Sequence, residues 1–161
     1  MSVYTSDTNE GVGRPTANQV DLALLVIRIA GALVFLYHGS AILFGAFGGP
    51  GLSGFSEHAH MPFAVALLVG LAQFCGGLAF ATGVLTRLGG VAISAVMLGA
   101  IFLVHISKGF DVTKGGIEFA LTQLLIAVAL TITGAGRYSL ANLLPKRSES
   151  GSIGRTAGTH A

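Results

Sequence analysis

Four long apolar runs dominate this 161-residue chain and restrict the structures that it can form. They cover residues 22–47, 62–85, 88–107 and 116–134. Together they hold only two charged side chains, Arg28 and Glu118, and a helix of about 20 apolar residues crosses the hydrocarbon core of a bilayer. The runs show neither the polar face of a soluble helix nor the alternation of a membrane barrel strand. The sequence therefore predicts an all-α fold, a four-transmembrane-helix antiparallel bundle.

The charged residues are few, and their placement indicates a membrane topology. Only 10% of the chain is charged, against about 25% in soluble domains. With four spans both termini lie on one side, which carries six basic residues against two on the other. The six are Arg14, Arg87, Arg137, Lys146, Arg147 and Arg155, and the two are Lys108 and Lys114. The positive-inside rule predicts a multi-pass protein of the cell (inner) membrane with cytoplasmic N- and C-termini, and this spread of charge does not favour nucleic-acid binding.

Polar segments at both ends set the predicted domain limits. Residues 1–20 and 144–161 lack apolar periodicity, so they are predicted to be flexible cytoplasmic tails. Residues 21–143 are predicted to form one membrane domain. Its first loop, 48–61, starts with a Gly-Gly-Pro-Gly segment that stops a helix and favours turns, and this loop is expected to lie outside the cell. The many glycines of the second and third runs are expected to let helices approach closely.

Polar side chains inside the apolar runs are costly in lipid and usually face the interior of a bundle. At 100° per residue, one stripe of each predicted helix carries its most polar group. These groups are Arg28 and His38 in the first run, Gln73 in the second, His105 in the third and Glu118 in the fourth. In the fourth run the stripe consists of Glu118, Thr122, Leu125 and Ala129. If the four stripes face inward, the bundle has a polar interior.

The predicted topology brings His38, His105 and Glu118 to one level in the outer half of the membrane, with Arg28 and Gln73 deeper. This polar intramembrane cluster is a candidate ligand, quinone or proton site, because histidine and carboxylate groups exchange protons. His38, His105 and Glu118 are also candidate metal ligands. The third interpretation is a hydrogen-bonded network that only fixes helix packing. Arg28 either extends to the cytoplasmic interface or points inward to Gln73 or a ligand carbonyl.

Several short motifs occur in a fixed order along residues 20–143. They are His38-Gly39, Gly76-Gly77 followed by Gly83 and Thr86-Arg87, His105, Gly115-Gly116-Ile117-Glu118, and Gly134-Ala135-Gly136-Arg137-Tyr138-Ser139-Leu140. In this combination the chain resembles the DoxX family. The resemblance implies a small four-helix integral membrane protein, and some relatives are membrane subunits of quinol oxidase or thiosulfate:quinone oxidoreductase systems. Gln73 and Ala141 stand where the family commonly has acidic residues. The resemblance therefore implies no acid–base role for these two residues.

Three hypotheses of function follow. The first is an accessory or quinone-interacting subunit of a membrane redox system, oxidoreductase-associated but without its own prosthetic group. Quinone is its candidate cofactor, and neither a definite cofactor nor a catalytic residue is predicted. The second is a non-enzymatic scaffold or assembly factor that binds partner helices through its glycine faces. The third is a small transporter or proton pathway, for which four helices of one chain leave little room. The partners that these hypotheses allow are the lipid bilayer, a membrane or peripheral redox protein, and further copies of the chain as a homo-oligomer.

Overall fold

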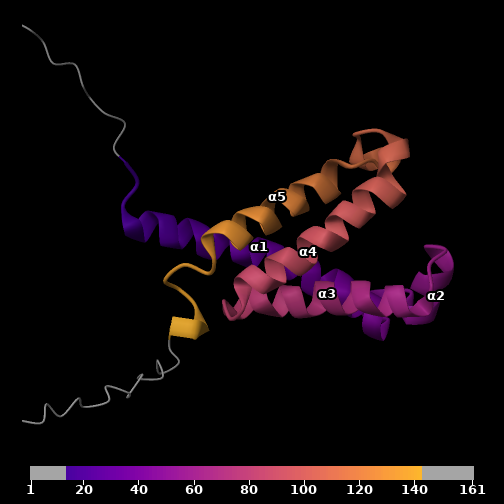
Figure 1. Cartoon of the computed structure of the whole chain (residues 1–161), viewed down its shortest axis with the longest axis horizontal. Helices are drawn as coiled ribbons and strands as arrows, with labels where there is room; N and C mark the ends of the chain where they lie inside the picture. Colours follow the sequence, from indigo (N-terminus) through magenta and orange to yellow (C-terminus); the bar gives the residue numbers. More distant parts are fainter. Residues whose placement is uncertain (1–13, 143–161) are drawn as a thin grey trace, which may run out of the picture.

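The computed structural model of the protein describes residues 14–142, and every regular element in that part of the chain is a helix. Four long helices run antiparallel to their neighbours in the chain (Figure 1). They are α1 (Ala17–Phe44), α3 (Phe63–Thr82), α4 (Thr86–Ala100) and α5 (Glu118–Thr133). We call the end where α1 and α4 begin and α3 and α5 end the terminal end, and the opposite end the loop end. The prediction of an all-α fold is confirmed.

Three helices are long and apolar enough to cross a membrane, by length and composition. They are Ala17–Phe44, Phe63–Thr82 and Thr86–Lys108, the last of which continues α4 through a π-helical turn (Ile101–His105) and a 3-10 turn (Ile106–Lys108). Helix α5 has only 16 residues. At 1.5 Å per residue it is about 24 Å long, which is less than a hydrocarbon core of about 30 Å. The fourth full crossing predicted for residues 116–134 is therefore not confirmed.

The predicted loop at 48–61 contains a short helix. Helix α2 (Gly51–His58) contacts both α1 and α3 at the loop end (Figure 1). Pro50 stands directly before this helix. A proline is tolerated at a helix start, because its missing N–H would have no partner there and its fixed φ suits a helix. Leu52 and Phe55, three residues apart, are half-buried. Helix α1 is capped by Gly45, which has a φ of +67°, and the new helix begins directly after Pro50, within the predicted loop.

The N-terminal limit of α1 lies within the predicted tail. The Thr16 hydroxyl accepts the N–H of Gln19, and the Gln19 side chain accepts the N–H of Thr16, which forms a capping box. Helix α1 therefore starts at Ala17, five residues before the predicted first run. Residues 1–13 of the predicted N-terminal tail and the whole predicted C-terminal tail, 144–161, lie outside the described residues, as does residue 143. The remaining elements are 3-10 turns at Ala46–Gly48, Val112–Lys114 and Leu140–Asn142.

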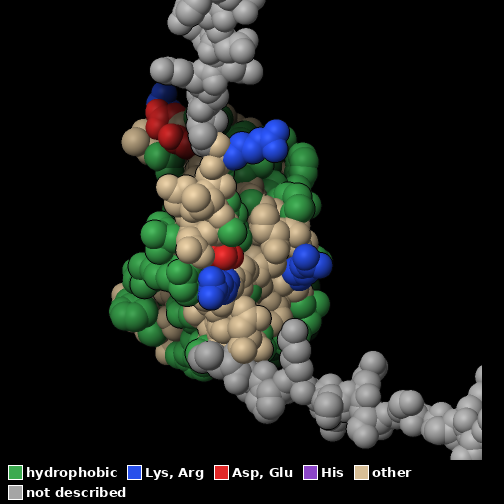
Figure 2. Space-filling model, turned by 90° about the vertical axis from the view of Figure 1, so that its left-hand side faces the viewer, with side chains coloured by type: hydrophobic (Ala, Val, Ile, Leu, Met, Phe, Trp, Pro, Cys, Tyr) green, Lys and Arg blue, Asp and Glu red, His purple; other side chains and the backbone are tan. Residues whose placement is uncertain are grey.

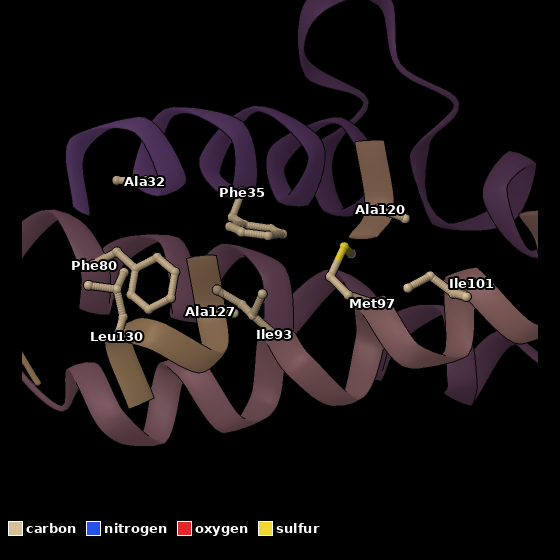
Figure 3. Packing of buried hydrophobic residues seen from close by; sticks show 9 residues of the cluster. All are labelled: Ala32, Phe35, Phe80, Ile93, Met97, Ile101, Ala120, Ala127 and Leu130. Carbon is tan, nitrogen blue, oxygen red and sulfur yellow. The ribbon is translucent and has the colours of Figure 1, made fainter. Parts of the chain in front are cut away.

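The centre of the bundle is apolar. Figure 3 shows aromatic and aliphatic side chains from all four long helices meeting in one cluster. Phe35 of α1 and Phe80 of α3 pack edge to face, with ring centroids 6.2 Å apart, and Ile93 of α4 and Leu130 of α5 are fully enclosed. Of the five polar groups of the predicted stripes, Arg28 and Gln73 are buried, whereas the centre itself is apolar. Among the described residues the buried polar side chains are Arg28, Gln73, Thr86 and Gln123.

Glycines set how closely the helices approach. A Cβ atom on Gly39 of α1 would lie 2.5 Å from the backbone nitrogen of Phe74 in α3. A Cβ on Gly77 of α3 would lie 2.8 Å from the backbone nitrogen of Leu36 in α1. Between α4 and α5, a Cβ on Gly90 would lie 2.9 Å from a carbonyl oxygen. The expected role of these glycines in close helix packing is confirmed.

Candidate functional site

Arg28 lies near the terminal end of the bundle with only 1% of its surface exposed. Its Nε donates to Phe80 O at 2.8 Å and its Nη2 to Ala81 O at 3.1 Å, both in the last turn of α3. Its Nη1 donates to Ala135 O at 2.9 Å and to Tyr138 O at 2.5 Å, in the segment after α5. One guanidinium thus joins α1, the end of α3 and the segment that follows α5. We call these groups the Arg28 clamp.

The clamp decides between the two predicted positions of Arg28. The side chain points inward, and its partners are backbone carbonyls, not Gln73. The last carbonyls of a helix have no partner within the helix and carry the negative end of its dipole, so a guanidinium suits them well. Gly83 leaves room for the guanidinium, because a Cβ at this position would lie 2.7 Å from Arg28 Nη2. Its φ of +75° also favours glycine over other residues.

His38 lies on α1 toward the loop end, and its side chain is exposed. None of the described residues forms a hydrogen bond with its imidazole. Two aromatic rings flank it: Tyr37 meets it edge-on with centroids 5.4 Å apart, and the Phe119 ring of α5 lies at 6.2 Å. Tyr37 also stacks on Phe47 at 5.0 Å. The structure therefore presents His38 at the bundle surface, inside a small aromatic group.

His38 was expected to face inward, and the packing of α1 explains why it does not. The buried positions of this helix include Arg28, Phe35, Gly39 and Ile42. From Phe35 the buried face continues to Gly39, four residues on, which presses against the backbone of α3. One step of 100° separates His38 from Gly39, so His38 is turned away from α3 toward the edge of α5.

His105 and Glu118 both hold the loop between α4 and α5. The Nδ1 of His105 lies 2.6 Å from Gly115 O, and the Oε2 of Glu118 accepts the N–H of Val112 at 3.1 Å. The hydroxyl and N–H of Thr113 donate to the Asp111 carboxylate, and these bonds lower the pKa of Asp111. The stability gained from the lowered pKa is present above the ordinary pKa and is lost as pH falls through the lowered value. The bonds of His105 to Gly115 O and of Glu118 to the N–H of Val112 favour the packing interpretation for these two residues.

We expect Glu118→Ala to loosen this loop without unfolding the protein. The N–H of Val112 would lose its acceptor, at a cost of about 1 kcal/mol, so its amide hydrogen exchange should become about fivefold faster. Hydrogen exchange measured by mass spectrometry or NMR in detergent checks this. Glu57→Ala, in an exposed carboxylate of α2, is the control. Equal Val112 exchange rates in Glu118→Ala and the parent protein would contradict the assigned role.

The interior amides differ from the predicted set. Gln73 is buried, as its stripe predicts. In α5, however, Leu125 of the predicted inward stripe is 61% exposed, and Gln123 is buried instead. The Oε1 of Gln123 and the Oγ of Ser94 are buried without a hydrogen-bond partner among the described residues. The sequence did not reveal Gln123 because α5 is apolar on all sides, so its periodicity does not select a face.

The candidate metal ligands do not form a cluster. Within residues 14–142, no three His, Cys, Asp or Glu side chains are grouped so that they could hold a metal ion. The structure therefore does not bring His38, His105 and Glu118 together into such a group. Arg28 is also remote from His38, since the two residues are 10 positions apart in α1, which corresponds to about 15 Å along the helix.

The outer surfaces of the long helices carry large apolar side chains. Leu33, Leu68 and Leu125 are 67%, 65% and 61% exposed, which suits lipid and not water as the solvent. The fold and these surfaces define a small helical membrane protein. The chain belongs to the DoxX family, whose model, described as DoxX, matches residues 23–106. This range includes Arg28 and His38 but ends before Glu118.

A curated relative is also similar over most of the chain. It is the Bacillus subtilis (strain 168) protein named "Putative oxidoreductase CatD", with 25% identity over 133 residues. The alignment covers 83% of this chain and 95% of that protein. No solved structure matches the chain.

Proposed function

We propose that the His38 surface binds the headgroup of a lipid-dissolved quinone. The protein would then act in the cell (inner) membrane as an accessory subunit of a redox system and pass electrons through a partner that carries the prosthetic group. The observation that carries this proposal is the exposed imidazole without a hydrogen-bond partner among the described residues. A polar group without a partner is costly in lipid, and a quinone oxygen is a partner that the lipid phase itself supplies.

The chemistry of the His38 surface suits a quinone headgroup. Imidazole offers one donor and one acceptor nitrogen, so it can bond either a quinone carbonyl or a quinol hydroxyl. A quinol that loses two electrons also releases two protons, and an imidazole nitrogen within hydrogen-bond reach can accept one of them. The rings of Tyr37 and Phe119 on either side favour contact with a planar ring. The name of the 25%-identical relative supports a redox role in general terms.

The binding of a short-chain ubiquinone to the purified protein tests this proposal. Titration in detergent, followed by calorimetry or ligand-observed NMR, should show saturable binding. His38→Ala should weaken it by about tenfold, the effect of losing one well-formed hydrogen bond. His58→Ala is the matched control, because His58 is an exposed histidine on α2 at the same end of the bundle. Equal affinity in His38→Ala and the parent protein would contradict the proposal.

The scaffold hypothesis has fewer glycines available for a partner helix. The glycines Gly39, Gly77 and Gly90 are occupied by contacts within the chain, whereas Gly99 has open space around it. The transporter hypothesis gains no support, because large apolar side chains fill the centre of the bundle.

His38→Ala in cells separates redox from scaffold roles. Loss of quinone-dependent activity at normal membrane levels favours the redox role, and loss of a partner protein alone favours the scaffold.

A further inference from the structure

The Arg28 clamp leaves one hydrogen-bond donor unused. A guanidinium has five N–H groups, and four of those of Arg28 donate to carbonyl oxygens. The fifth, on Nη2, has no acceptor among the described residues. All four acceptors are neutral carbonyls, so no carboxylate of the described chain balances the positive charge. A buried cation held only by dipoles remains a strong site for an anion.

A pocket lies next to the Arg28 clamp, and Arg28, Ala81 and Tyr138 of the clamp belong to its lining. Its volume is about 330 Å³, and Arg28 and Arg137 both line it. That volume falls at the lower end of the range of about 300–1,000 Å³ for small-molecule sites. Thr82 and Asn142 add a hydroxyl and an amide to the lining, and no acidic side chain belongs to it. The lining therefore carries two positive charges. The Thr82 hydroxyl and the Asn142 amide already donate to backbone carbonyls, so the two arginines are the groups that can bond to an oxyanion.

The pocket also lies where a lipid headgroup would be found. It is formed at the terminal end, where α3 stops and the chain leaves α5. Figure 2 looks onto this end and shows basic side chains, with acidic ones near some of them, on a mostly uncharged surface. The nearby Asp21 carboxylate accepts the backbone N–H of Arg137 at 2.9 Å, and the Arg137 guanidinium bonds to Asn18 instead. The apolar Leu25 and Leu140 complete the lining.

We propose that this pocket binds a phosphate group, which in the membrane is the headgroup phosphate of an anionic phospholipid. The spare N–H of Arg28 and the Arg137 guanidinium bond to the phosphate oxygens. Leu25 and Leu140 contact the apolar part of the lipid below the headgroup. Bound lipid then rests against the same guanidinium that joins α1, α3 and the segment after α5. Neither His38 nor a quinone takes part in this site.

Lipid-dependent stability of the full chain tests the proposal. The protein, purified in detergent, is titrated with phosphatidylglycerol, phosphatidylcholine or inorganic phosphate, and bound lipid is counted by native mass spectrometry. Phosphatidylglycerol should bind more tightly than phosphatidylcholine and raise the midpoint of thermal unfolding. Arg137→Gln should weaken phosphatidylglycerol binding by about fivefold, the contribution of one basic side chain at a membrane surface. Arg137→Lys keeps the charge and should retain most of the binding.

Arg87→Gln is the matched control, since Arg87 is an exposed arginine at the same end that does not line the pocket. It should bind phosphatidylglycerol as the parent protein does. If inorganic phosphate alone stabilises the protein in an Arg137-dependent way, the site binds the same group from a free source. Equal binding of the two lipids, without an effect of phosphate, would overturn the proposal even if Arg137→Gln does not fold. Equal losses in Arg87→Gln and Arg137→Gln would overturn it as well.

Discussion

Arg28→Met is expected to unfold the protein or prevent its accumulation in the membrane. Four carbonyls at the terminal end would lose a charged donor at once. Hydrogen bonds to charged groups contribute about 1.5–3 kcal/mol each, so the free energy of unfolding should fall by at least about 4 kcal/mol. This is a large part of the about 5–15 kcal/mol that stabilises a typical protein. Denaturation in detergent and the amount of protein in isolated membranes measure the loss.

Two further arginine variants make this result specific. Arg87→Met removes an exposed arginine with one long bond, 3.4 Å to Ile132 O, and should cost less than about 1 kcal/mol. Arg28→Lys keeps the charge but has three donors on one nitrogen, so it cannot reach both α3 and the segment after α5. The stability of Arg28→Lys should lie between that of the parent protein and that of Arg28→Met. Similar unfolding midpoints for Arg28→Met and Arg87→Met would show that the clamp does not hold the fold together.

Gly39→Ala is expected to give the second largest loss of stability. The added Cβ would lie 2.5 Å from the nitrogen and 2.7 Å from the Cα of Phe74. Both are backbone atoms of α3, so no side chain can turn aside, and the two helices have to separate. Overpacking of this kind costs about 1–3 kcal/mol or more, although alanine is the better helix former by about 1 kcal/mol. The midpoint of denaturation in detergent measures the effect.

Gly99→Ala is the control for Gly39→Ala. Gly99 lies on α4, and a Cβ there would meet no atom within 4 Å. The substitution should therefore leave stability unchanged or raise it by up to about 1 kcal/mol through helix propensity. If both variants change stability alike, close packing of α1 on α3 is not what Gly39 provides. Cysteine cross-linking between the two helices could then show whether they move apart.

The candidate site was predictable only in part. Gln73 was recognised as buried because one polar group stood out in an otherwise apolar run. The burial of Gln123 was not predicted, because several faces of α5 have similar hydropathy. His38 was expected to face inward, and only the contact of Gly39 with Phe74 sets the rotation of α1 that leaves it exposed. The partners of Arg28 are backbone carbonyls, which every residue has, so no sequence pattern marks them.

Composition and the length of the apolar runs were sufficient to determine that the protein is helical and belongs in lipid. Burial of backbone polar groups without water leaves a chain of this composition few alternatives to helices. The tertiary structure decided the rest: the short reach of α5, the helix α2 in the first loop, the apolar centre and the clamp around Arg28. These features depend on where each helix ends and how it is rotated. Contacts between distant residues set both, and hydropathy along the chain does not record such contacts.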